Sequence, residues 1–184
     1  QLAADLASYS AVISACAEIG EWELSLSVLN TIRSRNLTPD VIAFSAAISA
    51  CRRGVQSKWA LQLLHEMIEE KLKPDVISYS AAISACEEGR RWNHALNLLE
   101  CMQQSNVEPN VVTFSAVLSA CEKGKQWQRS LLLLGTMQHR IVMPNVVSYS
   151  AAISACEKAS QWQKSFQIWS QMIVARVPPN HISY

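Results

Sequence analysis

The chain of 184 residues has no apolar run near the roughly 20 residues that a transmembrane helix needs. It also has no excess of either charge: the formal net charge is +1, so there is no strong field to attract nucleic acid or a membrane surface. Any contact with nucleic acid must therefore depend on local groups. Gln1 begins no basic, serine-rich or apolar leader, and we expect any targeting peptide to lie outside this sequence. These absences predict a soluble protein without a membrane partner.

Motifs for metal, phosphate or nucleophilic chemistry are missing as well. No Cys-x-x-Cys pair occurs, and the four histidines share no ligand spacing with the six cysteines. There is no phosphate loop, no triad spacing, and no segment that combines His-x-Glu with Cys-x-x-Cys. We therefore expect no cofactor, no metal site and no catalytic activity.

What the sequence does contain is a unit repeated every 35 residues. Proline recurs at Pro39, Pro74, Pro109, Pro144 and Pro179, and cysteine at Cys16, Cys51, Cys86, Cys121 and Cys156. Full units span 6–40, 41–75, 76–110, 111–145 and 146–180, with a partial sixth at 181–184. A fixed period of this length is typical of architectures in which one supersecondary unit stacks on copies of itself. We expect residues 1–184 to form a single array that is part of a longer one.

Each unit is predicted to contain two helices, called helix A and helix B. In the third unit, one apolar stripe consists of Tyr79, Ile83 and Cys86. A second stripe consists of Trp92, Ala95, Leu96, Leu99 and Met102. The spacing predicts a helix A of about 10 residues from Tyr79 and a helix B of about 12 residues from Trp92. No stretch alternates with period two, so the sequence predicts an all-α fold.

The repeated cysteines and tryptophans are interpreted as packing residues. Stacked helices lie about 8–10 Å apart, too far for disulfides between equivalent cysteines, which are expected to be buried thiols. Only Cys101 is expected to be exposed. The tryptophans that begin helix B are placed in the core rather than used for base stacking: Trp22, Trp92, Trp127 and Trp162. Trp59 stands two residues late in its unit, which predicts an exposed ring.

Polar residues also repeat within helix A and at the end of each unit. A serine follows each aromatic residue of helix A, and Asp or Asn follows each closing proline. The local interpretation is helix capping. Capping alone does not require the observed order, with Asp40 and Asp75 first and Asn110, Asn145 and Asn180 after them.

The unit V-x-[ST]-[YF]-S-x-x-[IL]-S-A-C, followed by W-x-x-[AS]-[LF]-x-[LI]-[LW], a methionine and a closing P-[DN], resembles the pentatricopeptide repeat family over essentially the whole chain. Tetratricopeptide repeats are the near alternative, but their period is 34 residues, about one shorter. The resemblance implies a right-handed α-solenoid of tandem helix-turn-helix repeats. It also implies binding of single-stranded RNA at one base per repeat, mostly in organelles, that is, in the chloroplast or mitochondrion.

The resemblance assigns roles to particular residues. The fifth and last residues of a repeat would jointly recognise a base: Ser10 with Asp40, Ser45 with Asp75, Ser80 with Asn110, Ser115 with Asn145, and Ser150 with Asn180. The second residue of each unit would clamp the base: Ile42, Ile77, Val112, Val147 and Ile182, with the small Ala7 in the first unit. The thirteenth residue would contact phosphate: Arg53, Lys123 and Lys158, whereas Glu18 and Glu88 do not match.

The chemistry of the last residue suggests which base each repeat prefers. A carboxylate only accepts hydrogen bonds and suits the two donors of guanine, whereas an amide donates and accepts and suits adenine. The implied target is 5′-GGAAA-3′, in RNA processing or stability. A second hypothesis, from a different class, is a protein-interaction scaffold that holds a peptide on its concave face. Self-association is also predicted, through an apolar edge on the fifth helix B formed by Phe166, Ile168 and Trp169.

Overall fold

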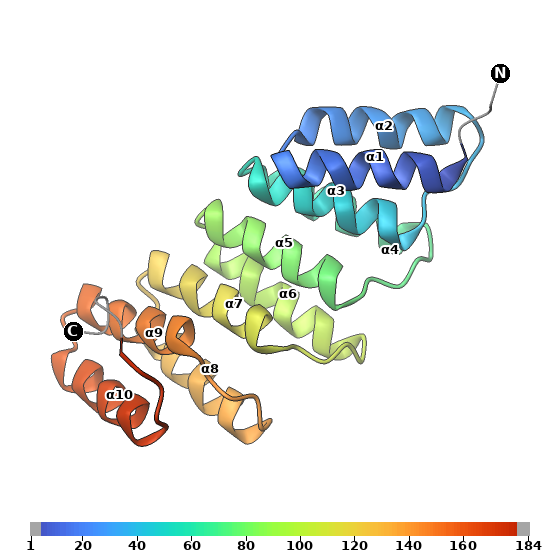
Figure 1. Cartoon of the computed structure of the whole chain (residues 1–184). Coiled ribbons are helices and arrows are strands. Elements are labelled where there is room, and N and C mark those ends of the chain that lie inside the picture. The colour runs from blue at the N-terminus through green and yellow to red at the C-terminus, as the bar shows by residue number, and fades with distance from the viewer. Residues whose placement is uncertain (1–4, 180–184) are drawn as a thin grey trace. The chain divides into compact units, whose positions relative to one another are not determined.

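A computed structural model describes residues 5–179, and every regular element in this range is a helix (Figure 1). The chain divides into two compact units, residues 1–89 and 90–184. The first unit contains α1 (Leu6–Ile19), α2 (Trp22–Ser34), α3 (Val41–Arg53), α4 (Ser57–Glu69) and α5 (Val76–Glu88). The second contains α6 (Trp92–Gln104), α7 (Val111–Lys123), α8 (Trp127–His139), α9 (Val146–Lys158) and α10 (Trp162–Val174). The predicted all-α fold is confirmed.

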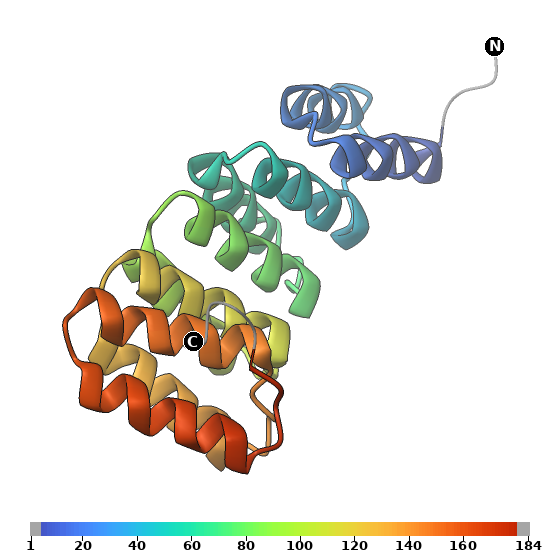
Figure 2. The same cartoon turned by 60° about the vertical axis from the view of Figure 1, so that its left-hand side comes forward.

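Within each unit the helices form two stacked layers. In the first unit α1, α3 and α5 lie side by side, α2 packs on α1 and α3, and α4 packs on α3 and α5 (Figure 1). In the second unit α7 and α9 lie side by side, α6 packs on α7, α8 packs on both, and α10 packs on α9 (Figure 2). Three of the helices B, namely α2, α4 and α8, therefore contact the helix A of the next repeat as well as their own. This is the packing of an α-solenoid, in which adjacent repeats complete each other's core.

Helix A begins earlier than the apolar stripe predicted. The stripe placed its start at Tyr79, whereas α5 begins at Val76, directly after Asp75. The Asp75 side chain accepts a hydrogen bond from the Ser78 backbone N–H and so satisfies one of the amides left free at a helix start. The cap, rather than the first buried aromatic residue, sets the beginning of the helix.

The predicted core residues of helix A are confirmed. Tyr79, Ile83 and Cys86 are buried, as are the equivalent residues of the other helices A except Tyr9, which is half-buried. All five cysteines at this position are buried free thiols, and Cys101 on α6 is exposed, as expected. Burial raises the pKa of the Cys51 thiol to about 12 and that of Cys121 to about 11. These thiols therefore remain protonated and unreactive near neutral pH.

The tryptophans that begin helix B do not lie in the centre of the core, so that prediction was wrong. Trp22, Trp92 and Trp127 are half-buried, and Trp162 is 71% exposed. The reason is their place at the joint between repeats: the indole of Trp22 lies against Gly54, and that of Trp92 against Gly124. Trp59 is exposed, as predicted, and its ring stacks on that of Trp22 with centroids 6.5 Å apart.

The apolar edge predicted on the fifth helix B is narrower than expected. Ile168 is 1% exposed and belongs to the core, which corrects its assignment to the edge. Phe166 is exposed and stacks on the half-buried Trp169, with ring centroids 5.7 Å apart. The one-residue step between Ile168 and Trp169 turns the side chain by about 100° around the helix, which explains why only one of them faces α9. Self-association through this edge stays a prediction.

Alkylation of the folded chain should label Cys101 and spare the other five cysteines. Cys101 is exposed, whereas the five helix A thiols are buried, and thiolate is the reactive form. Iodoacetamide at pH 8, followed by peptide mass spectrometry, measures this, and labelling in urea should reach all six. Equal labelling of Cys51 and Cys101 in buffer would contradict the described core.

Replacing Gly54 by alanine should destabilise the first unit by about 1 kcal/mol, because a Cβ there would overlap the indole of Trp22 and force it to move. Ala159 occupies the equivalent position of the fifth repeat, which shows that the backbone tolerates alanine and keeps the expected cost small. Gly135→Ala is the matched control, since its Cβ would meet nothing within 4 Å. That variant should be more stable than wild type, by about 0.5–1 kcal/mol. Urea unfolding compares the two, and equal stability would contradict the steric argument.

Candidate nucleic-acid interface

The last residue of each of the first four repeats caps the first helix of the next. The side chains of Asp40, Asp75, Asn110 and Asn145 accept hydrogen bonds from the backbone N–H three residues later, at 2.8, 2.8, 3.0 and 2.9 Å. In every case the accepting atom is Oδ1. The same cap occurs at Asp5 before α1. There the Ser8 hydroxyl and, with a smaller effect, the Ser8 backbone N–H donate to the Asp5 carboxylate, and both lower its pKa.

This cap determines which atom the side chain has left for a ligand. With Oδ1 engaged by the helix, an aspartate retains Oδ2, which only accepts, and an asparagine retains Nδ2, which only donates. Asp40 and Asp75 are half-buried, and Asn110 and Asn145 are exposed. Capping and ligand recognition therefore use different atoms of one side chain and do not exclude each other.

The structure brings two of the predicted pairs into direct contact. The Ser10 hydroxyl lies 3.5 Å from Asp40 Oδ1, and the Ser115 hydroxyl lies 3.3 Å from Asn145 Oδ1. Ser45 and Asp75 are joined through a third residue, Ser78, whose Oγ lies 2.7 Å from each of them. The serine and the capping residue thus form one polar cluster, although they are 30 residues apart in sequence.

The two remaining predicted pairs are Ser80 with Asn110 and Ser150 with Asn180. Ser80 lies half-buried on α5 in the first unit, and Asn110 precedes α7 in the second. Ser150 is buried on α9, whereas its predicted partner Asn180 and the predicted clamp Ile182 lie outside the described residues.

The predicted clamp residues are exposed apolar side chains beside these clusters. Each is the second residue of its helix A, two positions after the cap, and 53–64% of its surface is exposed: Ile42, Ile77, Val112 and Val147. A single exposed apolar side chain is common on protein surfaces, but here one recurs at the same position of four successive repeats. An apolar contact next to two polar atoms is an arrangement that suits a flat, hydrogen-bonding ligand such as a nucleobase.

The three predicted phosphate-contacting cations are exposed, and two of them, Arg53 and Lys158, are paired with acids of the preceding repeat. Arg53 donates to the Glu18 backbone carbonyl at 2.6 Å and forms an ion pair with its carboxylate at 3.2 Å. Lys158 forms an ion pair with Glu122 at 2.7 Å, and Lys123 is exposed at the end of α7. These pairs were not predicted from the sequence, although acid and cation are separated by about one repeat. A phosphate would have to compete with the carboxylate for each paired cation.

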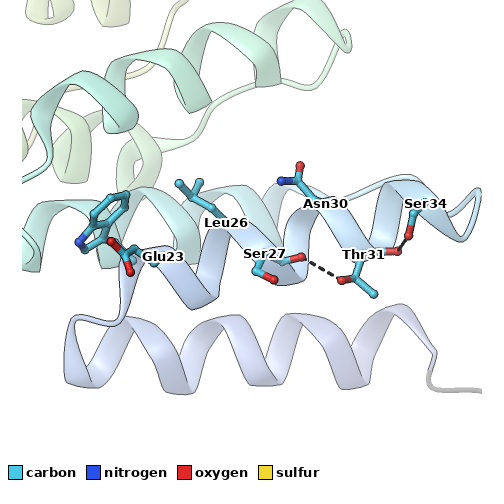
Figure 3. Close-up of a pocket in the computed structure, with 7 residues that line it drawn as sticks. Glu23, Leu26, Ser27, Asn30, Thr31 and Ser34 are labelled. Atoms are coloured by element: carbon cyan, nitrogen blue, oxygen red, sulfur yellow. Dashed lines mark hydrogen bonds between the residues drawn. The ribbon is translucent and has the colours of Figure 1, made fainter.

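Other sites offer less chemistry. Figure 3 shows a concavity on one face of α2, lined by residues from Trp22 to Ser34, where Thr31 donates to the Ser27 carbonyl at 2.9 Å. Its lining contains no lysine or arginine and none of the predicted site residues. Within residues 5–179 no group of acids, histidines and cysteines is arranged to bind a metal. In the same range no helix combines the length and apolar character needed to cross a membrane.

Two family models of pentatricopeptide repeats match the chain. A model of the pentatricopeptide repeat domain matches residues 1–54, 62–125 and 97–159. A second model, of the PPR repeat, matches residues 42–72 and 147–177. A search of curated protein sequences finds no match.

The structural neighbours share the fold at low sequence identity. PPR10 in complex with an 18-nt psaJ RNA element superimposes with a TM-score of 0.84 at 23% identity over 99% of this chain, which spans 27% of that protein. PPR10 from maize gives 0.74 at 22% identity over 100% of this chain and 26% of its own. The PPR domain of Arabidopsis thaliana protein-only RNase P 1, in complex with tRNA, gives 0.81 at 10% identity, covering 93% of this chain and 90% of that domain.

The ranges matched by the two family models together contain every described helix, and the structural neighbours share the fold. The repeat period, the caps and the packing of helix B between neighbouring helices A agree with both findings. This chain belongs to the pentatricopeptide repeat family.

Proposed function

We propose that the chain is a sequence-specific module for single-stranded RNA that takes one base per repeat, prefers 5′-GGAAA-3′ and has no catalytic activity of its own. The observation that carries the proposal is that the two polar atoms of the capping side chain have different partners. Oδ1 holds the next helix, and Oδ2 or Nδ2 is left beside a serine hydroxyl and an exposed apolar side chain. The structural neighbours PPR10 and protein-only RNase P 1, both in complexes with RNA, support it.

The two kinds of capping residue select different bases. At repeats one and two, the carboxylate Oδ2 and the serine oxygen can both accept from the N1–H and N2–H donors of guanine. At repeat four, the Asn145 Nδ2 donates to adenine N1 while the Ser115 oxygen accepts from the adenine amino group. The exposed Val147 contacts the face of the base bound there.

The place of action proposed for this module is an organelle, the chloroplast or mitochondrion, in RNA processing or stability. Family membership alone supports this part of the proposal. Selection from a random RNA pool tests the binding itself and the order of bases. Enrichment of GGAAA would support the proposal. Absence of any enriched RNA, together with retention of a protein partner, would favour the scaffold hypothesis instead.

The Asn145→Asp variant should change the fourth preferred base from A to G. The exchange replaces the Nδ2 donor by an Oδ2 acceptor, while Oδ1 still caps α9, so stability should stay the same. A contact of this kind is worth about 1–3 kcal/mol, or roughly five- to 150-fold in relative affinity. Competition between 5′-GGAAA-3′ and 5′-GGAGA-3′ measures the shift. Asn97→Asp, on the exposed surface of α6, is the charge-matched control and should leave the preference unchanged.

The Lys158→Ala and Glu122→Gln variants should change affinity in opposite directions for every RNA sequence. Lys158→Ala removes one phosphate contact, which lowers the slope of log affinity against log salt by about one. Glu122→Gln releases Lys158 from its 2.7 Å ion pair, so binding should tighten by up to about fivefold, the scale of an exposed pair. Glu100→Gln on helix α6 is the control for removal of an acid. A changed base preference in either variant would show that Lys158 does not act on the backbone.

A further inference from the structure

A third hydroxyl lies behind the serine and capping residue in two of the measured clusters. It belongs to the third residue of the following repeat, Ser78 in the first unit and Ser148 in the second, and both are fully buried. The family motif contains Ser or Thr at this place, and the sequence analysis gave it no role. Because a buried hydroxyl must direct its hydrogen at a definite acceptor, its position restrains the neighbours it contacts.

The direction of the hydrogen bonds in the Ser78 cluster follows from counting donors. The Asp75 carboxylate can only accept, so Ser78 gives its single hydroxyl hydrogen to Asp75 Oδ1 at 2.7 Å. Ser45 lies 2.7 Å from the Ser78 oxygen, and Ser78 has no second hydrogen to give. Ser45 is therefore the donor in that contact. Its own hydrogen points into the protein, and only lone pairs remain for a base.

The Ser148 cluster repeats this arrangement with an amide. Ser148 donates to Asn145 Oδ1 at 3.0 Å, and the Ser115 oxygen lies 2.8 Å from the Ser148 oxygen and 3.3 Å from Asn145 Oδ1. With the Ser148 hydrogen used on Oδ1, Ser115 has two inward acceptors for its own. The Ser115 hydroxyl is thus held in the same direction as that of Ser45.

The first repeat lacks this third hydroxyl and provides an internal comparison. Ala43 takes the equivalent position and has no hydroxyl, so its contribution to the cap is its backbone N–H, which donates to Asp40 Oδ1 at 2.8 Å. The Ser10 hydroxyl contacts Asp40 Oδ1 at 3.5 Å, at the outer limit of hydrogen bonding. The Ser10 hydroxyl is therefore held weakly and can turn its hydrogen outward.

We propose that a hydroxyl at the third residue of the following repeat, as in Ser78 and Ser148, is a positioning group that fixes the hydroxyl of the fifth residue as an acceptor and so sharpens the choice of base. The inference rests on the proposed function. In the second repeat, adenine would place its N1 lone pair against two acceptors, Asp75 Oδ2 and the restrained Ser45 oxygen. A hydroxyl free to turn would donate to that N1 and tolerate adenine. Ser78 thereby excludes adenine from a site that accepts guanine.

The test measures guanine-to-adenine preference at the first two bases with the full chain. Affinities for 5′-GGAAA-3′, 5′-GAAAA-3′ and 5′-AGAAA-3′ give one preference ratio for each position. In wild type the ratio should be higher at the second base than at the first, because only the second repeat is followed by a hydroxyl at this place. Ser78→Ala should lower the ratio at the second base by about two- to tenfold, the scale of one net hydrogen bond.

Two further variants separate positioning from structure. Ser78→Thr keeps the hydroxyl, as Thr113 does at the equivalent place of the fourth repeat, and should retain the wild-type ratio. Ala43→Ser adds a hydroxyl behind Ser10 and should raise the ratio at the first base by a similar factor. A loss of packing alone would weaken both oligomers equally and leave each ratio unchanged. If Ser78→Ala fails to fold, Ala43→Ser still decides the question.

The outcomes distinguish this inference from the function beneath it. The inference is supported if Ser78→Ala lowers the guanine-to-adenine ratio at the second base, Ala43→Ser raises it at the first base, and Ser78→Thr keeps the wild-type ratio. A wild type that prefers guanine at both positions, with ratios that neither substitution moves, overturns the positioning role and leaves RNA recognition intact. A wild type that binds all three oligomers equally overturns the proposed function, and the inference with it.

Discussion

One hydrogen bond recurs along the described repeats. In it, the Oδ1 atom of the last residue of a repeat accepts from a backbone N–H in the first turn of the next helix A. It sets where that helix begins, as the start of α5 at Val76 shows. It also fixes the rotamer of the side chain, since Oδ1 cannot leave the helix end without exposing a free amide. The position of Oδ2 or Nδ2 follows from this constraint. A feature required for folding therefore aims the atom proposed to meet the base.

This arrangement explains how the last residue of a repeat can vary between Asp and Asn without altering the fold. Asp and Asn cap about equally well, so exchanging them costs the helix little. The exchange reverses the hydrogen-bonding character of the second atom, from acceptor to donor. In the proposed mode of binding, specificity is consequently carried by the one side-chain atom that the helix cap does not use. The order of Asp40, Asp75, Asn110 and Asn145 is free to encode a sequence because every member satisfies the same cap.

Much of this could be predicted from the sequence, because the periodic features reflect local rules. The period gave the repeats, and the spacing of Tyr79, Ile83 and Cys86 gave a buried stripe that the structure confirms. The tryptophans were placed wrongly because periodicity gives a helix face, not a depth, and Trp22 lies at the joint beside Gly54. The partners of Arg53 and Lys158 were missed because an ion pair across repeats depends on how the helices stack. The direction of the Ser45 hydroxyl likewise requires measured distances.

The boundaries of a recognition site do not coincide with those of a repeat. The cluster proposed for the second base draws Ser45 and Asp75 from one repeat and Ile77 and Ser78 from the next. A cut after Asp75 would therefore leave Ile77 and Ser78, the two residues proposed to clamp and restrain the base, on the other fragment. Because Ser78 also donates to the cap, the third residue cannot be changed without touching both the helix start and the site. The proposed functional unit is thus offset from the folding unit, since it runs from the fifth residue of one repeat to the third of its successor. Exchanging whole 35-residue units would therefore alter two neighbouring proposed sites at once.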